Sequence, residues 1–85
     1  MSAYHHKALL IDSTDGVCRY QYFPACYDHP DTSGVFAFHT ATCNVDVELP
    51  TDHQHDQHAV GGLTHKITKM IRNGEPAPET ILFVG

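Results

Sequence analysis

The chain has 85 residues, enough for one domain with a single hydrophobic core. Such a domain has little core to spare for a deep cleft, so its length disfavours a self-contained enzyme with a large pocket. Ten acidic residues against five basic ones give a formal net charge of −5. This charge makes nucleic acid an unfavourable partner, because phosphate backbones repel an acidic protein.

The first part of the chain predicts paired antiparallel strands. A β-rich run over residues 4–11 is followed by the turn cluster 12–16 and by residues 17–23, where side chains alternate along a second strand. Strand, Asp-Gly turn and strand predict a β-hairpin. Pro24 ends the second strand, and residues 27–34 form a loop rich in Pro, Asp, Ser and Gly.

Residues 35–49 predict two more strands, at 35–38 and 43–49. Apolar residues occupy even positions in the first strand and odd positions in the second, so the side-chain phase flips by one residue between them. Such a flip needs a tight hairpin or a bulge in one long strand, and we favour the hairpin. The odd-numbered residues of the second strand are expected to face the core: Cys43, Val45, Val47 and Leu49.

One amphipathic helix is expected to begin within residues 52–58 or just after them, because apolar residues recur with helical spacing between positions 60 and 71. The opposite side of this helix is basic and is read as its solvated face. The apolar face comprises Val60, Leu63, Ile67, Met70 and Ile71. The basic side comprises Lys66, Lys69 and Arg72.

Both ends of the helix have capping signals. Asp52 or Asp56 could be the N-cap, or Thr64 if Gly61-Gly62 breaks the first turn. Asn73-Gly74 is typical of a C-cap, and the prolines that follow prevent the helix from continuing.

Residues 80–84, Thr80 followed by four apolar residues, form a β-rich run that is most easily read as a strand paired inside the sheet. The order β-β-β-β-α-β predicts a small α+β domain over residues 1–85, an antiparallel sheet with one amphipathic helix packed on one face. One helix covers only part of five strands, so the other face must be solvated or covered by a second copy, and we favour a homodimer. Its interface is assigned to four strand aromatics: Tyr20, Tyr22, Phe36 and Phe38.

Residues 52–58 read Asp-His-Gln-His-Asp-Gln-His, and the chain has eight histidines, more than its lysines and arginines together. Three imidazoles with a carboxylate are a reasonable ligand set for Zn²⁺ or another divalent transition metal. The alternatives are a solvated loop and a pH-sensitive interface. The candidate metal ligands are His53, His55, His58 and Asp56.

The three cysteines form no CxxC pair and no secretory signal is recognised, so a reducing cytoplasm is expected. Cys18 and Cys43 occupy inward strand positions and are expected to be buried, whereas Cys26 is expected to be the exposed thiol. No oxyanion-hole pattern or helix N-terminus follows Cys26, so no catalytic residue is assigned.

These features favour a non-catalytic acidic module that binds another protein through its sheet surface or an edge strand. Proteins of this size and charge occur among bacterial and phage-encoded regulators and inhibitors, an analogy of composition alone. The alternatives are a metal-binding or metal-sensing protein that uses the histidine segment and a small enzyme with a site at a dimer interface. No membrane partner is expected, because the longest apolar runs are only four residues long.

Overall fold

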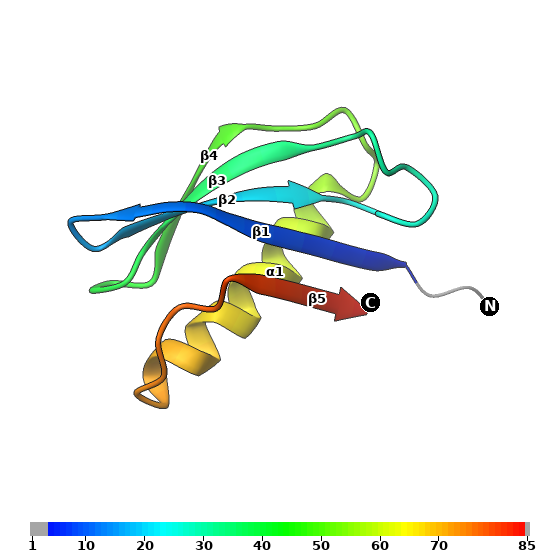
Figure 1. Ribbon diagram of the computed structural model, residues 1–85. Helices are drawn as coiled ribbons and strands as arrows, with labels where there is room; N and C mark the ends of the chain where they lie inside the picture. Colours follow the sequence, from blue (N-terminus) through cyan, green and yellow to red (C-terminus); the bar gives the residue numbers. More distant parts are fainter. Residues whose placement is uncertain (1–3, 85) are drawn as a thin grey trace.

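The computed structural model describes residues 4–84, which form one antiparallel sheet with a helix across one of its faces (Figure 1). The strand order in the sheet is β4-β3-β2-β1-β5. This confirms the predicted α+β class and the chain order β-β-β-β-α-β. The elements are β1 (His5–Thr14), β2 (Val17–Phe23), β3 (Gly34–His39), β4 (Asn44–Leu49), α1 (Asp56–Arg72) and β5 (Thr80–Val84).

The β1–β2 hairpin closes through Asp15 and Gly16, whose φ angles are +52° and +78°. Positive φ at both central residues is typical of the type I′ turn, which matches the twist of paired strands. Strand β1 continues three residues beyond its predicted end. A bulge between Leu10 and Asp12 lets pairing resume, so that the turn joins Thr14 directly to Val17.

The hydrophobic core lies between α1 and one sheet face. The helix contributes Leu63 and Ile67, both fully buried. The sheet contributes the aromatics assigned above to a dimer interface, and each has 0% of its surface exposed. That assignment is wrong, because β2 and β3 are paired so that these four side chains lie on the sheet face that α1 covers. The buried aromatics are Tyr20, Tyr22, Phe36 and Phe38.

Strand β4 is joined to β3 by the predicted tight hairpin, but the strand is less buried than expected. Cys43 lies in the turn, with φ +61°, and is only partly buried. Val47 is 43% exposed and Leu49 is 61% exposed, so the prediction that both face the core is wrong. The reason is that α1 packs mainly against β5, β1 and β2, and a register shift in the β3–β4 pairing also reverses the side-chain phase before Leu49.

The predicted helix end and the predicted helix start within residues 52–58 are confirmed, but none of the predicted N-cap residues caps the helix. At the C-terminus, the Gly74 N–H donates to the Ile71 carbonyl and the Glu75 N–H donates to the Met70 carbonyl, the pair of bonds that defines a Schellman motif. At the N-terminus the cap is His55, which makes no side-chain capping bond. The Asp56 carboxylate is committed to other partners, described below.

Within residues 4–84, strand β5 pairs with β1 alone, so it is an edge of the sheet and not an interior strand as its apolar sequence suggested. Ile81 is buried beneath α1, and Phe83 is partly buried and packs against the same core. Leu82 and Val84 point to the other face and are 40% and 53% exposed. The short strand therefore contributes one row of side chains to the core while its outer main chain stays unpaired by any strand.

Candidate functional site

A groove of about 380 Å³ runs between α1 and the edge strand β5. One wall is helical and carries two ammonium groups; the other is the strand and the segment leading into it. Among the described residues, no acidic side chain lines the groove. Its lining residues are Lys66, Lys69, Met70, Asn73, Pro78, Thr80, Ile81 and Leu82.

The main chain of β5 presents hydrogen-bonding groups to this groove. The Lys66 ammonium donates to the Leu82 carbonyl at 2.6 Å, which shows that this carbonyl points away from β1. In an antiparallel ladder the N–H and C=O of one residue point to the same side. The Leu82 N–H therefore also points outward, and the alternation of the strand gives Thr80 and Val84 the same direction.

The two edge strands of the sheet differ in how well they are protected against pairing with another chain. Strand β4 carries Asp46 and Glu48 and is bent by a register shift, two features that discourage pairing with another chain. Strand β5 has no charged side chain and no register shift against β1. Among the described residues, the one contact that hinders strand pairing at this edge is the hydrogen bond from the Lys66 ammonium to the Leu82 carbonyl. Edge β5 is therefore the one suited to accept a further strand.

Sequence reasoning missed this groove. Lys66 was assigned to the solvated face of the helix, and β5 was read as an interior strand. A wholly apolar strand normally indicates burial on both sides, so the sequence signal was misleading. The sequence gives one indication of the groove. The helical spacing of Lys66 and Lys69 places both lysines beside the inward face of the helix.

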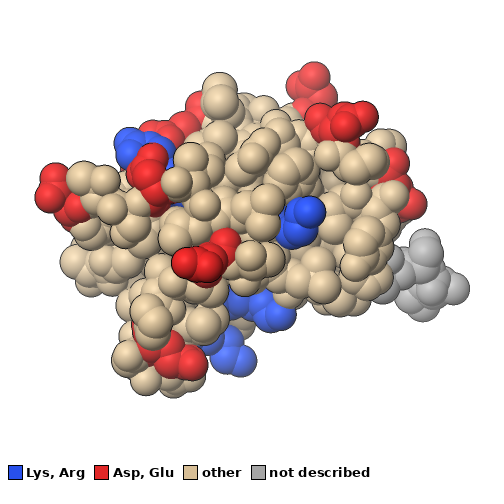
Figure 2. Space-filling view, in the orientation of Figure 1, with Lys and Arg blue, Asp and Glu red and all other residues tan. Residues whose placement is uncertain are grey.

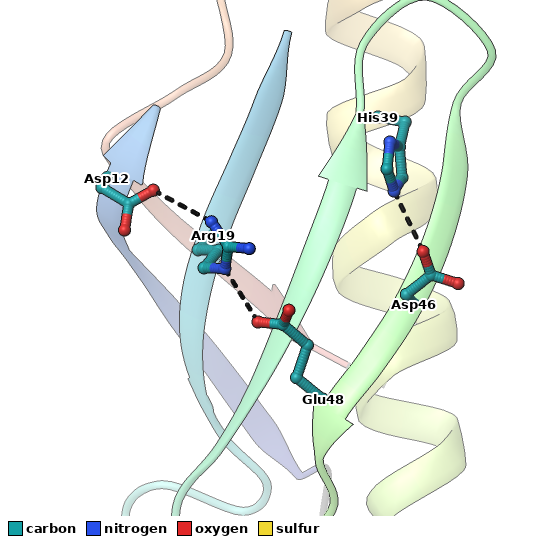
Figure 3. A network of polar contacts seen from close by, with 5 residues as sticks. All are labelled: Asp12, Arg19, His39, Asp46 and Glu48. Carbon is teal, nitrogen blue, oxygen red and sulfur yellow. Dashed lines mark hydrogen bonds and ion pairs between the residues drawn. The ribbon is translucent and has the colours of Figure 1, made fainter. Parts of the chain in front are cut away.

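Charges are distributed unevenly over the molecule. Figure 2 shows Lys and Arg atoms at the lower margin, near α1 and β5, and further ones near the centre and at the upper left, while Asp and Glu atoms lie along the upper margin and also near the centre and at the lower left. On the helix-free face three acidic side chains already have partners within the chain. The Arg19 Nε donates to Glu48 Oε1 at 2.9 Å, and the guanidinium also lies 3.6 Å from Asp12 (Figure 3).

The Arg19–Glu48 ion pair reaches from β2 across β3 to β4, where Ala37 is the register partner of both Arg19 on β2 and Asp46 on β4. A small side chain at that central position leaves room for the Arg19–Glu48 ion pair above it. Asp46 is in turn 3.0 Å from the His39 Nε2 (Figure 3). The hydrogen bond to Glu48 is the main reason that the pKa of Arg19 is raised above its ordinary value. The acidic residues of this face are thus mostly engaged within the chain.

A histidine cluster lies at the end of the sheet where the start of β1 meets the segment before α1. The His53 ring lies 4.8 Å from that of His29 and 5.4 Å from that of His55, measured between centroids. The His6 ring lies 5.6 Å from that of His58. The predicted histidine segment is therefore joined by two imidazoles from distant parts of the chain.

His6 is the buried member of this cluster, with 0% exposure. Its Nδ1 accepts a hydrogen bond from the Ala25 N–H at 3.0 Å, and its Nε2 is buried without a partner among the described residues. An Nδ1 that accepts carries no proton, so the imidazole is neutral. Burial first, and then the neighbouring His58, His55, His53 and His5, lower the pKa of His6.

The four predicted metal ligands do not converge. His53 accepts the His55 N–H at Nδ1, at 3.0 Å, while His58 packs against His6 and Phe83. Within residues 4–84, no group of three or more His, Cys, Asp or Glu side chains is placed to hold a metal ion.

Asp56 stabilises the start of the helix. Its Oδ1 accepts hydrogen bonds from the Tyr22 hydroxyl at 2.7 Å and from the Thr51 hydroxyl and N–H at 2.6 and 3.0 Å. Burial and the adjacent Asp56 raise the pKa of Tyr22 well above its usual range, so the phenol remains a donor. Asp56 therefore ties α1 to β2 and to the preceding loop through its Oδ1.

No protein-family model, curated protein or solved structure matches this chain. In the part of the chain that the structure describes, no helix has the length and apolar character needed to cross a membrane.

Proposed function

We propose that this protein is a non-catalytic binding module that takes up an extended segment of another protein as an additional strand beside β5. The observation that carries the proposal is the outward main chain of Leu82, which faces a groove and belongs to an edge without charged side chains. Main-chain hydrogen bonds would supply affinity, and the groove would receive alternate side chains of the segment.

The other surface considered from the sequence, the acidic sheet face, supports binding less well. Asp12 and Glu48 are held by Arg19, and Asp46 is held by His39. A basic partner would have to displace these contacts. The three cysteines are free, which suits a reducing compartment such as the cytoplasm.

Selection of random peptides displayed on phage, followed by amide NMR mapping, tests this proposal. Selected peptides are expected to shift the amides of Thr80, Leu82 and Val84 most strongly. The variant Leu82→Pro removes an outward N–H and leaves the bonds between β1 and β5 in place, because edge strands tolerate proline when its nitrogen faces outward.

The matched control is Leu82→Thr, which shortens the side chain and keeps the N–H. Binding that is lost in Leu82→Pro and retained in Leu82→Thr supports strand addition. Shifts that map to the helix-free face or to the histidine cluster, or equal binding by both variants, would contradict it.

A further inference from the structure

We infer that the segment received beside β5 is acidic and that Lys66 selects it. The inference rests on the proposed strand addition and names the chemistry of the partner. It starts from the bond between the Lys66 ammonium and the Leu82 carbonyl, which an incoming strand cannot leave in place.

An added strand needs the Leu82 carbonyl as an acceptor for one of its own N–H groups. The Lys66 ammonium occupies that carbonyl at 2.6 Å and must be displaced. A hydrogen bond from an ammonium is stronger than one between neutral groups, so its loss opposes binding. A Glu or Asp side chain on the incoming strand offers the displaced ammonium a new charged partner. A neutral strand offers none, and a basic strand repels it.

The surroundings of Lys66 favour the same partner. Lys69 lies one turn farther along the same groove, and Asn73 adds a further hydrogen-bonding side chain. Among the described residues neither lysine forms an ion pair, since the ion pairs present involve Arg19 and His39. The nearest acid along the strand, Glu79, precedes β5 and does not line the groove. The groove therefore offers uncompensated positive charge.

A second copy of this chain fits less well. Antiparallel pairing of β5 with β5 of another copy would place both helices on one face of a continuous sheet. Lys66 and Lys69 of each copy would then approach their counterparts, and like charges across an interface oppose association. The charge of the groove thus favours a different, acidic chain over self-pairing.

Three short capped peptides test the inference. All three alternate Thr and Val and differ only at two positions, which are both Glu, both Gln or both Lys. Dissociation constants are measured by fluorescence anisotropy, and NMR shifts of the β5 amides verify the site. The Glu peptide is expected to bind about tenfold more tightly than the Gln peptide, and the Lys peptide most weakly. The advantage of Glu should shrink as salt screens it.

Variants separate the role of Lys66 from general electrostatics. In Lys66→Gln the Leu82 carbonyl loses its ammonium, so the Gln peptide should bind more tightly than to the unmodified protein and the preference for Glu should largely vanish. Arg72→Gln removes an equal charge from an exposed helical position outside the groove and should keep that preference.

The two proposals fail in different ways. Peptides that shift the β5 amides with equal affinity for Glu, Gln and Lys would overturn the acidic preference and leave strand addition standing. Peptides that leave the β5 amides unmoved would overturn both. Sedimentation showing copies joined through β5 and dispersed by Leu82→Pro would replace the acidic partner with a second copy.

Discussion

The buried imidazole of His6 accepts a hydrogen bond at Nδ1 from the main-chain N–H of Ala25, 3.0 Å away. This contact ties the start of β1 to the segment that follows β2, where Ala25 adopts a positive φ of 48°. Protonation of His6 would place two donors face to face and bury a charge beside His58 and His55. The neutral imidazole is thus a structural requirement of the fold.

Stability is accordingly expected to fall in mild acid. In the unfolded chain His6 titrates near its ordinary pKa of about 6.5, whereas burial and the adjacent histidines lower its pKa in the folded state. The unfolded state therefore takes up the proton first. The stabilisation from neutral His6 is fully present above about pH 6.5 and is lost progressively as pH falls below this value.

Urea melts between pH 7.5 and pH 5 measure this dependence. The variant His6→Gln cannot titrate, so its unfolding free energy should vary less steeply with pH than that of the unmodified protein. His65→Gln, at an exposed helical position, is the matched control and should keep most of the original slope. Parallel slopes for the unmodified protein and His6→Gln would show that His6 does not govern the response.

Two neighbouring glycines of α1 should respond in opposite ways to alanine. A Cβ at Gly62 would overlap with the Phe83 ring, so Gly62→Ala should lower the free energy of unfolding by about 1–3 kcal/mol. A Cβ at Gly61 would meet nothing within 4 Å, so Gly61→Ala should raise it by up to about 1 kcal/mol through helix propensity. Thermal melts of the pair check this, and a stabilised Gly62→Ala would contradict the described packing of β5 on α1.

The helix depends on one deeply buried side chain. Ile67 is fully buried in the core, so Ile67→Ala should cost on the order of 2–4 kcal/mol. Arg72→Ala, at an exposed position of the last helical turn, should change stability by no more than about 0.5 kcal/mol. Similar losses for both variants in urea melts would mean that the assigned helical face is wrong.

Cysteine reactivity should follow the structure and reverse the order predicted from the sequence. Cys26, expected to be exposed, is 7% exposed, and its N–H donates to the His5 carbonyl. Cys18 is 3% exposed, whereas Cys43 lies in the β3–β4 turn and is only partly buried. Under native conditions an alkylating reagent should label Cys43 first, as read by peptide mass spectrometry. Faster labelling at Cys26 would place that loop in a more open conformation.

The parts of the fold that local chemistry determines were predictable from the sequence. The Asp15-Gly16 turn specifies the first hairpin, and Asn73-Gly74 specifies the helix end, because each needs the positive φ that Gly adopts freely. The phase flip around residues 39–43 also indicated the second hairpin correctly. In each case the determining residues are adjacent in the chain.

The remaining features depend on how distant elements pack. Nothing local to Tyr20 or Phe36 shows which sheet face the helix covers, so the sequence pattern predicts an interface at residues that in fact form the core. Similarly, the apolar run of β5 could not show that β1 is its single strand partner. The histidine cluster gained His6 and His29 only because the fold brings β1 and the β2–β3 loop beside residues 53–58.

Hydrogen exchange at the Leu82 amide tests strand addition most directly. This N–H points outward from an edge strand, so it should exchange rapidly in the free protein and become protected when the Glu-bearing peptide is added. The amides of Ile81 and Phe83, which face β1, should change little and serve as internal controls. A Leu82 amide that exchanges equally fast with and without saturating peptide would contradict the account.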